Sequence, residues 1–107
     1  MKNVKMPTSY RYREFLIECL KDPEHAAGYI EAILEEKDPE PELLRNALRK
    51  VIEAWEKSDR LTDSAKQLHE KLDRMLTESN AAEIYTFIEL MDKLGFRVAI
   101  LPKEAET

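Results

Sequence analysis

Residues 21–40 read KDPEHAAGYIEAILEEKDPE, and the tetrapeptide Lys-Asp-Pro-Glu stands at both ends of this stretch, at 21–24 and at 37–40. An aspartate side chain can accept a hydrogen bond from the free N–H groups in the first turn of a helix. A proline directly after the aspartate loses nothing, because the N–H that it lacks would be unpaired there. Apolar residues at helical spacing follow each tetrapeptide. The sequence therefore predicts that a helix begins at each of them, and that the chain is a stack of short helices.

Outward from this stretch, the spacing of apolar residues predicts five helices. They are expected at about residues 9–20, 22–36, 38–57, 62–76 and 80–94. The third helix could begin near Asp38 or near Pro41. Asn80 is predicted to cap the fifth helix, with Glu83 in the capping-box position. Gly95 is expected to end that helix in a left-handed conformation. Gly28 lies inside the second helix, where close packing of a neighbouring helix or simple tolerance would explain it, and close packing is favoured.

Each predicted helix has an apolar stripe that is expected to face the core. In the first helix the stripe is Tyr12, Phe15, Leu16, Cys19 and Leu20, and in the second it is Ala26, Ala27, Ile30, Ile33 and Leu34. In the third it is Leu43, Leu44, Ala47, Leu48, Val51, Ile52 and Trp55. In the fourth and fifth it is Ala65, Leu68, Leu72, Met75 and Leu76, then Ile84, Phe87, Ile88, Met91 and Leu94.

After Gly95 the pattern changes, and residues 96–101, FRVAIL, are rich in β-forming residues and are ended by Pro102. They predict one short C-terminal strand. A lone strand leaves its backbone groups without ladder partners. Two arrangements solve this: pairing with the same strand of a second copy through Phe96, Val98 and Ile100, or an extended tail solvated by water. Pairing is favoured, so we expect a homodimer.

The composition of the chain narrows the classes of protein and of ligand that are expected. A chain of 107 residues with 43% apolar residues forms one domain with a real core. The sequence has no apolar run long enough to cross a membrane, and no apolar stretch follows Met1–Lys5, so we expect neither a membrane anchor nor a secretory signal but a cytoplasmic protein. The net charge of −5 weighs against broad electrostatic binding of nucleic acid.

No catalytic or metal-binding pattern is present in the sequence. His25 and His69 are far apart, and neither His-x-x-x-His nor Cys-x-x-Cys spacing occurs, so no metal site is expected. Two glycines cannot form a phosphate-binding loop, and the serines stand where caps and turns explain them. We therefore expect no catalytic residue, no cofactor and no enzymatic activity.

One helix carries the side chains suited to DNA. Lys66, Gln67, His69, Lys71 and Arg74 lie on the fourth predicted helix and could read base edges or contact phosphates. Glu70 and Asp73 interrupt them, and residues 62–76 contain no break, so the residues alone favour a solvated polar face. Trp55 could stack on a base, although its place in an apolar stripe favours the edge of the core.

The sequence also resembles a known family. Residues 16–30, LIECLKDPEHAAGYI, are similar to the signature L-I-x-x-L-K-D-P-E-x-A-A-x-Y-[LI] of addiction-module antidote proteins, which are small antitoxins. Residues 32–54, AILEEKDPEPELLRNALRKVIEA, resemble the next block, A-x-L-E-E-x-D-P-x-x-L-L-x-A-L-x-x-V-A-E-A. Residues 94–98, LGFRV, resemble the family's L-G-L-R-L exit from its last helix, and residues 75–80, MLTESN, stand where the family has A-L-S-E-x-G-N-P.

This resemblance implies an all-α, five-helix, lambda-repressor-like bundle with a helix-turn-helix and one short C-terminal strand. Within a single domain over 1–107 it implies a flexible tail at 1–8, N-terminal helices at 9–57, a degenerate helix-turn-helix region at 58–95 and the strand at 96–101. The region is degenerate because the glycine of the family's turn, expected near 61–74, is missing and Asp73 replaces an aromatic residue.

The implied function is a transcriptional regulator that binds operator DNA through the five residues of the fourth helix and also binds a small toxin protein. The alternative is a protein-interaction module that keeps the same helical frame and has lost DNA binding.

Overall fold

A computed structural model describes residues 8–103 of the chain. Within these residues the chain forms five α-helices, and their bounds are α1 Thr8–Leu20, α2 Pro23–Leu34, α3 Leu43–Lys57, α4 Asp63–Ser79 and α5 Ala82–Lys93. The prediction of an all-α chain with five helices is confirmed. The tail predicted at 1–8 lies outside the described residues, except for Thr8, which begins α1.

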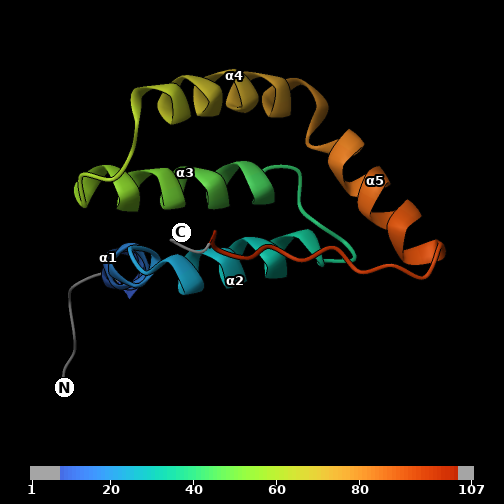
Figure 1. The fold of residues 1–107 in the computed structure, drawn as a ribbon, viewed down its shortest axis with the longest axis horizontal. Helices are drawn as coiled ribbons and strands as arrows, with labels where there is room; N and C mark the ends of the chain where they lie inside the picture. The colour runs from blue at the N-terminus through green and yellow to red at the C-terminus, as the bar shows by residue number, and fades with distance from the viewer. Residues whose placement is uncertain (1–7, 104–107) are drawn as a thin grey trace.

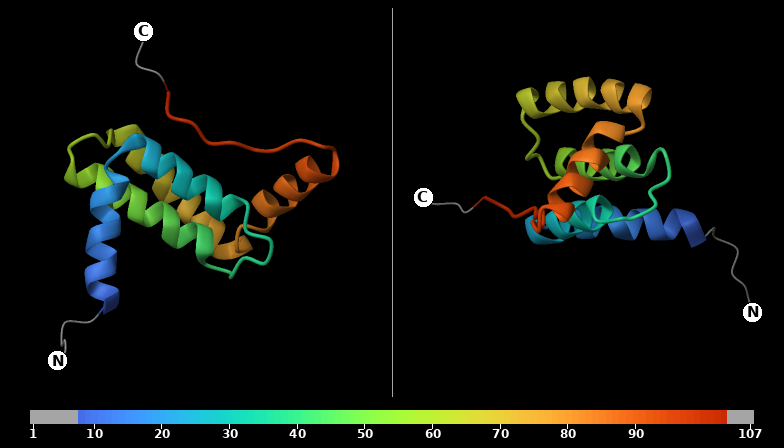
Figure 2. Two further views of the ribbon diagram at one scale, coloured as in Figure 1. Left: turned by 90° about the horizontal axis from the view of Figure 1, so that it is seen from below. Right: turned by 90° about the vertical axis from the view of Figure 1, so that its right-hand side faces the viewer.

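The helices are stacked in layers, as Figure 1 shows. Helix α3 lies in the middle, with α1 and α2 on one side and α4 on the other. Helix α5 descends obliquely from the α4 layer towards the end of α2, and the C-terminal segment then runs back past α2. Figure 2 shows that α1 projects from the stack at a large angle to α2. The principal extents are 52 × 37 × 26 Å, so the shape is elongated and flat.

The first Lys-Asp-Pro-Glu begins a helix as predicted. Asp22 is the N-cap of α2, and its side chain accepts a hydrogen bond from the backbone N–H of His25 at 3.3 Å. Pro23 occupies the first helical position, where its ring costs no hydrogen bond.

The second Lys-Asp-Pro-Glu does not begin a helix, so the predicted start at Asp38 was wrong, and the alternative start near Pro41 is closer to the observed one. Residues 35–42 form turns and bends, and α3 begins only at Leu43, with Glu42 as an N-cap that makes no side-chain capping bond. The reason is Pro41, which follows Pro39 by two residues. A residue that precedes proline is disfavoured in the α conformation, so Asp38 and Glu40 cannot both continue a helical turn.

Helix α3 takes part in both hydrophobic clusters of the core. The first cluster consists of the buried residues Ile17, Leu20, Ala26 and Ala54, with Val51 and Trp55 packed against them. The second consists of Leu34, Leu44, Leu76 and Ala81, with Leu48 and residues of α5 packed against them. Small residues let neighbouring helices approach closely here: Ala47 is 1% exposed and Ala54 is 0% exposed.

The predicted core faces of three helices were partly wrong. In α1 the buried residues are Ile17 and Leu20, whereas Tyr12 and Phe15 are exposed. In α4 and α5 the expected core residues that are exposed instead are Leu68, Met75, Phe87 and Leu94. Each of these helices has an apolar surface wider than its neighbours cover, so spacing alone could not tell the covered part from the uncovered part.

No strand is present among residues 8–103, so the strand predicted at 96–101 does not form within the single chain. The segment is held by side chains instead of a backbone ladder. The carboxylate of Glu31 on α2 accepts a hydrogen bond from the backbone N–H of Ile100 at 3.0 Å. Pairing with a second copy therefore stays a prediction, with one backbone donor of the segment already used.

The junction between α4 and α5 differs from the predicted capping box. Asn80 is the C-cap of α4, and Ala81 is the N-cap of α5 without a side-chain capping bond. Both residues have a left-handed backbone conformation, with φ of 55° and 63°. Asparagine tolerates this conformation, but alanine does so only at a cost. The methyl group of Ala81 is buried in the second cluster, which explains why glycine does not stand there.

Gly95 ends α5 as predicted. Its φ is +93°, and the backbone N–H groups of Gly95 and Phe96 donate to the carbonyls of Asp92 and Met91, the pattern of a Schellman motif. Gly28 differs from expectation: it is exposed, and a Cβ built on it would meet nothing within 4 Å. No neighbouring helix packs closely on Gly28.

We predict opposite effects when the two glycines are replaced. Gly28→Ala should raise the free energy of unfolding by about 0.5–1 kcal/mol, because it removes backbone freedom from a helix interior without a clash. Gly95→Ala should lower it by about 1 kcal/mol, because a side chain is strained in the left-handed region. Urea unfolding measures both, and a gain in stability from Gly95→Ala would contradict the C-terminal assignment.

Candidate functional site

The region expected to hold the helix-turn-helix contains one long helix. Helix α4 is continuous from Asp63 to Ser79, so there is no turn inside residues 63–74. The turn that follows consists of Asn80 and Ala81 and leads into α5. The second helix of this pair is therefore α5, and the five predicted DNA-binding residues lie on the first.

The structure separates these five residues. Gln67, Lys71 and Arg74 are exposed, and their spacing places them on one face of α4. Lys66 is turned towards α3, where its Nζ lies 3.5 Å from a carboxylate oxygen of Glu56. His69 is half-buried, and its Nε2 is buried without a hydrogen-bond partner among the described residues. Lys66 is nevertheless 52% exposed, so His69 alone of the five is largely withdrawn from the surface.

Asp73, which the sequence placed among the DNA-suited side chains of α4 as an interruption, faces α3. Arg49 donates two hydrogen bonds to its carboxylate, from Nε at 3.1 Å and from Nη2 at 2.9 Å. Arg45 adds an ion pair at 3.4 Å. The hydrogen bonds from Arg49 lower the pKa of Asp73 more than its partial burial raises it. Asp73 therefore joins α3 to α4.

The charge around these helices is acidic. Helix α4 carries four carboxylates and three Lys or Arg, and α5 carries three carboxylates and one lysine. A helix that reads DNA normally presents an excess of positive charge to the phosphates. Neither helix of the pair has such an excess.

Trp55 lies at the edge of the core, as its place in the stripe predicted. Its Nε1 donates to the carbonyl of Leu20 at 3.2 Å, and the guanidinium of Arg60 lies over its ring at 4.5 Å from the centroid. The stacked Arg60 also donates to the carbonyl of Lys21. The covered ring is not available to stack on a base.

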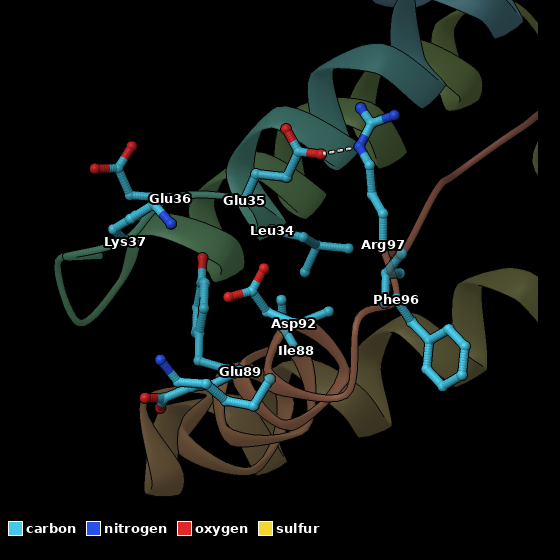
Figure 3. A pocket seen from close by; sticks show the side chains of 12 residues that line it. Leu34, Glu35, Glu36, Lys37, Ile88, Glu89, Asp92, Phe96 and Arg97 are labelled. Atoms are coloured by element: carbon cyan, nitrogen blue, oxygen red, sulfur yellow. Dashed lines mark hydrogen bonds and ion pairs between the residues drawn. The ribbon is translucent and has the colours of Figure 1, made fainter.

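A groove of about 530 Å³ lies between the end of α2, α5 and the start of the C-terminal segment (Figure 3). Its apolar lining includes Leu34, Ile88 and Val98. Its charged lining consists of Glu35, Glu36, Lys37, Glu89, Asp92, Lys93 and Arg97. Tyr85 and Phe96 complete it.

Arg97 fastens one wall of the groove to α2. Its Nη2 donates to Glu31 at 2.6 Å and its Nε donates to Glu35 at 2.8 Å, the second of which Figure 3 marks. These carboxylates raise the pKa of Arg97. Glu31 also holds the backbone of Ile100. Glu31 lies in the last turn of α2 and Glu35 is its C-cap, four residues on, so the two carboxylates lie on the same side.

The residues of the predicted dimer strand have three different environments. Val98 lines the groove, Ile100 packs against the second core cluster, and Phe96 is 61% exposed. Val98 and Ile100 are therefore used within the chain, whereas Phe96, at the edge of the groove, presents most of its ring to solvent.

The charge of the groove remains partly uncompensated. Glu36, Glu89 and Asp92 form no ion pair with any residue in 8–103, whereas Glu35 is neutralised by Arg97. Tyr85 donates its hydroxyl to the carbonyl of Ile33 at 2.9 Å. Burial, and then the nearby carboxylate of Glu36, raise the pKa of Tyr85. Lys37 and Lys93 line the same groove and likewise form no ion pair with the described residues. The groove thus combines an apolar floor with a rim of mixed charge in which carboxylates outnumber cations by four to three.

Sequence reasoning missed this groove. One signal was present: Glu31 and Glu35 stand four residues apart on α2, and Arg97 is the first cation after α5. The pairing of Arg97 with these carboxylates depends on the direction of α5 relative to α4. The two residues between these helices, Asn80 and Ala81, both have a left-handed backbone conformation.

No family model matches the chain, and neither a curated protein nor a solved structure matches it. None of the helices in the described part has the length and apolar character needed to cross a membrane. In that same part no three His, Cys, Asp or Glu residues come together as metal ligands would.

The lowered pKa of Asp73 predicts how its replacement depends on pH. A carboxylate whose pKa is lower in the folded state stabilises the fold above its unfolded pKa of about 3.9 and loses this effect as the pH falls through the folded pKa. Asp73→Asn should therefore lower the free energy of unfolding by about 1 kcal/mol at pH 7, and the deficit should shrink below about pH 4.

Chemical unfolding across this pH range measures the effect. Glu70→Gln is the matched control, because Glu70 is exposed and makes no ion pair with the described residues. An Asp73→Asn deficit that is the same at low and neutral pH would contradict the proposed role of the carboxylate.

Proposed function

We propose that this chain is a protein-interaction module that binds a basic, amphipathic segment of a partner protein in the groove between α2, α5 and residues 96–98. The groove is the observation that carries the proposal, because it joins an apolar floor to a rim in which carboxylates outnumber cations. If the chain acts as the addiction-module antidote proteins that it resembles, the bound partner would be the toxin.

The chemistry of the groove supports this class of partner. Leu34, Ile88 and Val98 offer apolar contacts, which would favour one face of a helix or alternate side chains of a strand. Glu36, Glu89 and Asp92 form no ion pair with the described residues and outnumber the two lysines of the rim, Lys37 and Lys93, so Lys or Arg on the partner would neutralise them. Complementary charges at a rim increase the association rate and select the partner.

The wall formed by the C-terminal segment supports recognition by shape. The two bonds from Arg97 and the bond from Glu31 to Ile100 hold this wall to α2 before a partner arrives. A preformed wall reduces the entropy that binding would otherwise lose.

We predict that reversing the charge of the rim weakens binding of a basic peptide. A fluorescently labelled amphipathic Lys/Leu peptide is the probe, and its Glu/Leu counterpart tests the sign of the charge. The double variant Glu89→Lys, Asp92→Lys should weaken binding of the Lys/Leu peptide at least about tenfold by anisotropy.

The control is Glu70→Lys, Glu78→Lys, which changes the net charge equally on exposed positions of α4. It should alter the affinity by no more than about twofold. Equal losses in the two double variants would show that the peptide responds only to net charge, and this would contradict binding in the groove.

Operator DNA is the second candidate ligand, in line with the resemblance to a lambda-repressor-like regulator. One observation favours it: Gln67, Lys71 and Arg74 are exposed on one face of α4. Glutamine and arginine are side chains that read base edges, and lysine contacts phosphate. The acidic balance of α4 and α5 makes this candidate weaker than the first.

We predict that, if this second function exists, DNA from upstream of the chain's own reading frame is retarded at low salt. The affinity should fall steeply with salt because counterions are released. Lys71→Glu with Arg74→Glu should abolish the shift, whereas the same changes at Lys37 and Lys93, beside the groove, should not. No shift at micromolar protein would reject DNA binding and leave the protein-interaction function as the surviving candidate.

A further inference from the structure

Residues 96–103 form an extended segment that runs back past α2, as Figure 1 shows, and that we name the strap. None of its residues is fully buried. Beyond Phe96, only the backbone N–H of Ile100 donates a hydrogen bond to another described residue. The strap is therefore attached to the helices by side chains and one backbone group, and not by the backbone ladder that would tie a strand into a sheet.

Two glutamates at the end of α2 hold the strap. Arg97 donates to Glu31 at 2.6 Å and to Glu35 at 2.8 Å, and Figure 3 marks the second bond. The other carboxylate oxygen of Glu31 accepts the backbone N–H of Ile100 at 3.0 Å. The side chain of Glu31 is 18% exposed, less than any other carboxylate in an ion pair between described residues. All polar contacts of this enclosed carboxylate go to the strap.

The apolar residues of the strap alternate as those of a bound extended peptide do. Val98 and Ile100 are half-buried, the first in the wall of the groove and the second against the second core cluster. Ala99 and Leu101 are exposed. Extended peptides are recognised through alternate side chains, and carboxylates bind arginine through charge-assisted hydrogen bonds. The surface of α2 thus accepts an arginine followed by apolar residues one and three positions later.

The strap can leave this surface without unfolding a helix. The hydrogen bonds of Gly95 and Phe96 end α5 before the strap begins, and they do not involve its later residues. The side chain of Arg97 is 70% exposed, and ion pairs at such exposure contribute little to stability. Leu101 is 78% exposed. Another segment with the same pattern of side chains could therefore compete for the same contacts.

We infer that Glu31 and Glu35, with the apolar surface beneath the strap, form a binding site for an extended segment of a partner protein, and that the strap fills this site as an autoinhibitory contact. Charge complementarity sets the chemistry of the occupant, because Arg97 is the only described cation that pairs with either glutamate. The partner's segment carries an arginine with branched apolar residues one and three positions after it. This site goes beyond the proposed function, because it lies under the strap, whereas the strap itself is one wall of the groove.

A peptide with the sequence of the strap, FRVAILPK, tests the inference on the full chain. In the wild type the tethered strap has a high effective concentration and should exclude the free peptide. Arg97→Glu places a third carboxylate against Glu31 and Glu35 and should release the strap. The peptide should then bind at least about tenfold more tightly than to the wild type. Chemical-shift titration of the isotope-labelled protein measures the affinity and should place the shifts on α2.

Arg13→Glu is the matched control variant. Arg13 is also an exposed arginine bonded to a glutamate, Glu53 on α3, at 2.6 Å. Its replacement changes the net charge equally and should leave the peptide excluded. Adding Glu31→Gln to Arg97→Glu keeps the strap released but removes a charge from the site, so it should weaken peptide binding at least about tenfold. Circular dichroism establishes that the variants are folded.

A second peptide, FEVAILPK, has glutamate in place of the arginine and should not bind to Arg97→Glu. Equal binding of the two peptides, or equal binding of FRVAILPK to the wild type and to Arg97→Glu, would overturn the inference. A wild-type dimer that Arg97→Glu converts to monomer in sedimentation velocity would also overturn it, because the occupant would then be the strap of a second copy.

The groove variant separates this site from the proposed function. Glu89→Lys and Asp92→Lys, added to Arg97→Glu, should change the affinity for FRVAILPK by no more than about threefold, because neither residue holds the strap. Loss of Lys/Leu peptide binding and loss of strap peptide binding are therefore distinguishable.

Discussion

The burial of α3 between two layers is the constraint on which the rest of the structure depends. Its C-terminal half supplies Ala54 to the first core cluster, and its N-terminal half supplies Leu44 to the second. Ala47 and Ala54 are almost fully buried, and they stand seven residues apart on one face of the helix. Helices α1, α2 and α4 all pack directly against α3.

Helix α5 lies outside this central arrangement, and its position explains the candidate functions. It meets the second core cluster through one narrow face, in which Ile84, Tyr85 and Ile88 pack against neighbours without being fully buried. One flank of α5 therefore forms a groove with α2 and the C-terminal segment, and another flank remains open. The residues Tyr85 and Ile88 belong to both regions, because they pack against the second core cluster and also line the groove.

The sequence predicted where the helices begin and end more accurately than it predicted which side of each helix is buried. The Asp22 cap and the Gly95 stop depend on neighbouring residues alone, and both were found where they were expected. The start of α3 was misplaced because Pro41 overrides the local signal of Asp38 and Pro39. The exposed Phe15 and Phe87 were predicted as core residues, because a helical stripe does not reveal how much of it another helix covers.

The candidate site was less predictable than the fold for a physical reason. Exposure of Gln67, Lys71 and Arg74 follows from the polar pattern of α4, but the attachment of Asp73 to Arg49 requires knowledge of how α4 packs on α3. The groove depends on contacts between residues more than sixty positions apart, such as Arg97 with Glu31. A local pattern carries no information about such contacts.

Native-state hydrogen exchange at submicromolar protein tests the central claim most directly, because it compares the opening free energies of α3 and α5 in one monomeric molecule. If α3 forms the centre and α5 a peripheral arm, the amides in the middle of α3 exchange only by global unfolding, and those of α5 exchange at least about a hundredfold faster by local opening. Equal protection in the two helices would contradict this account.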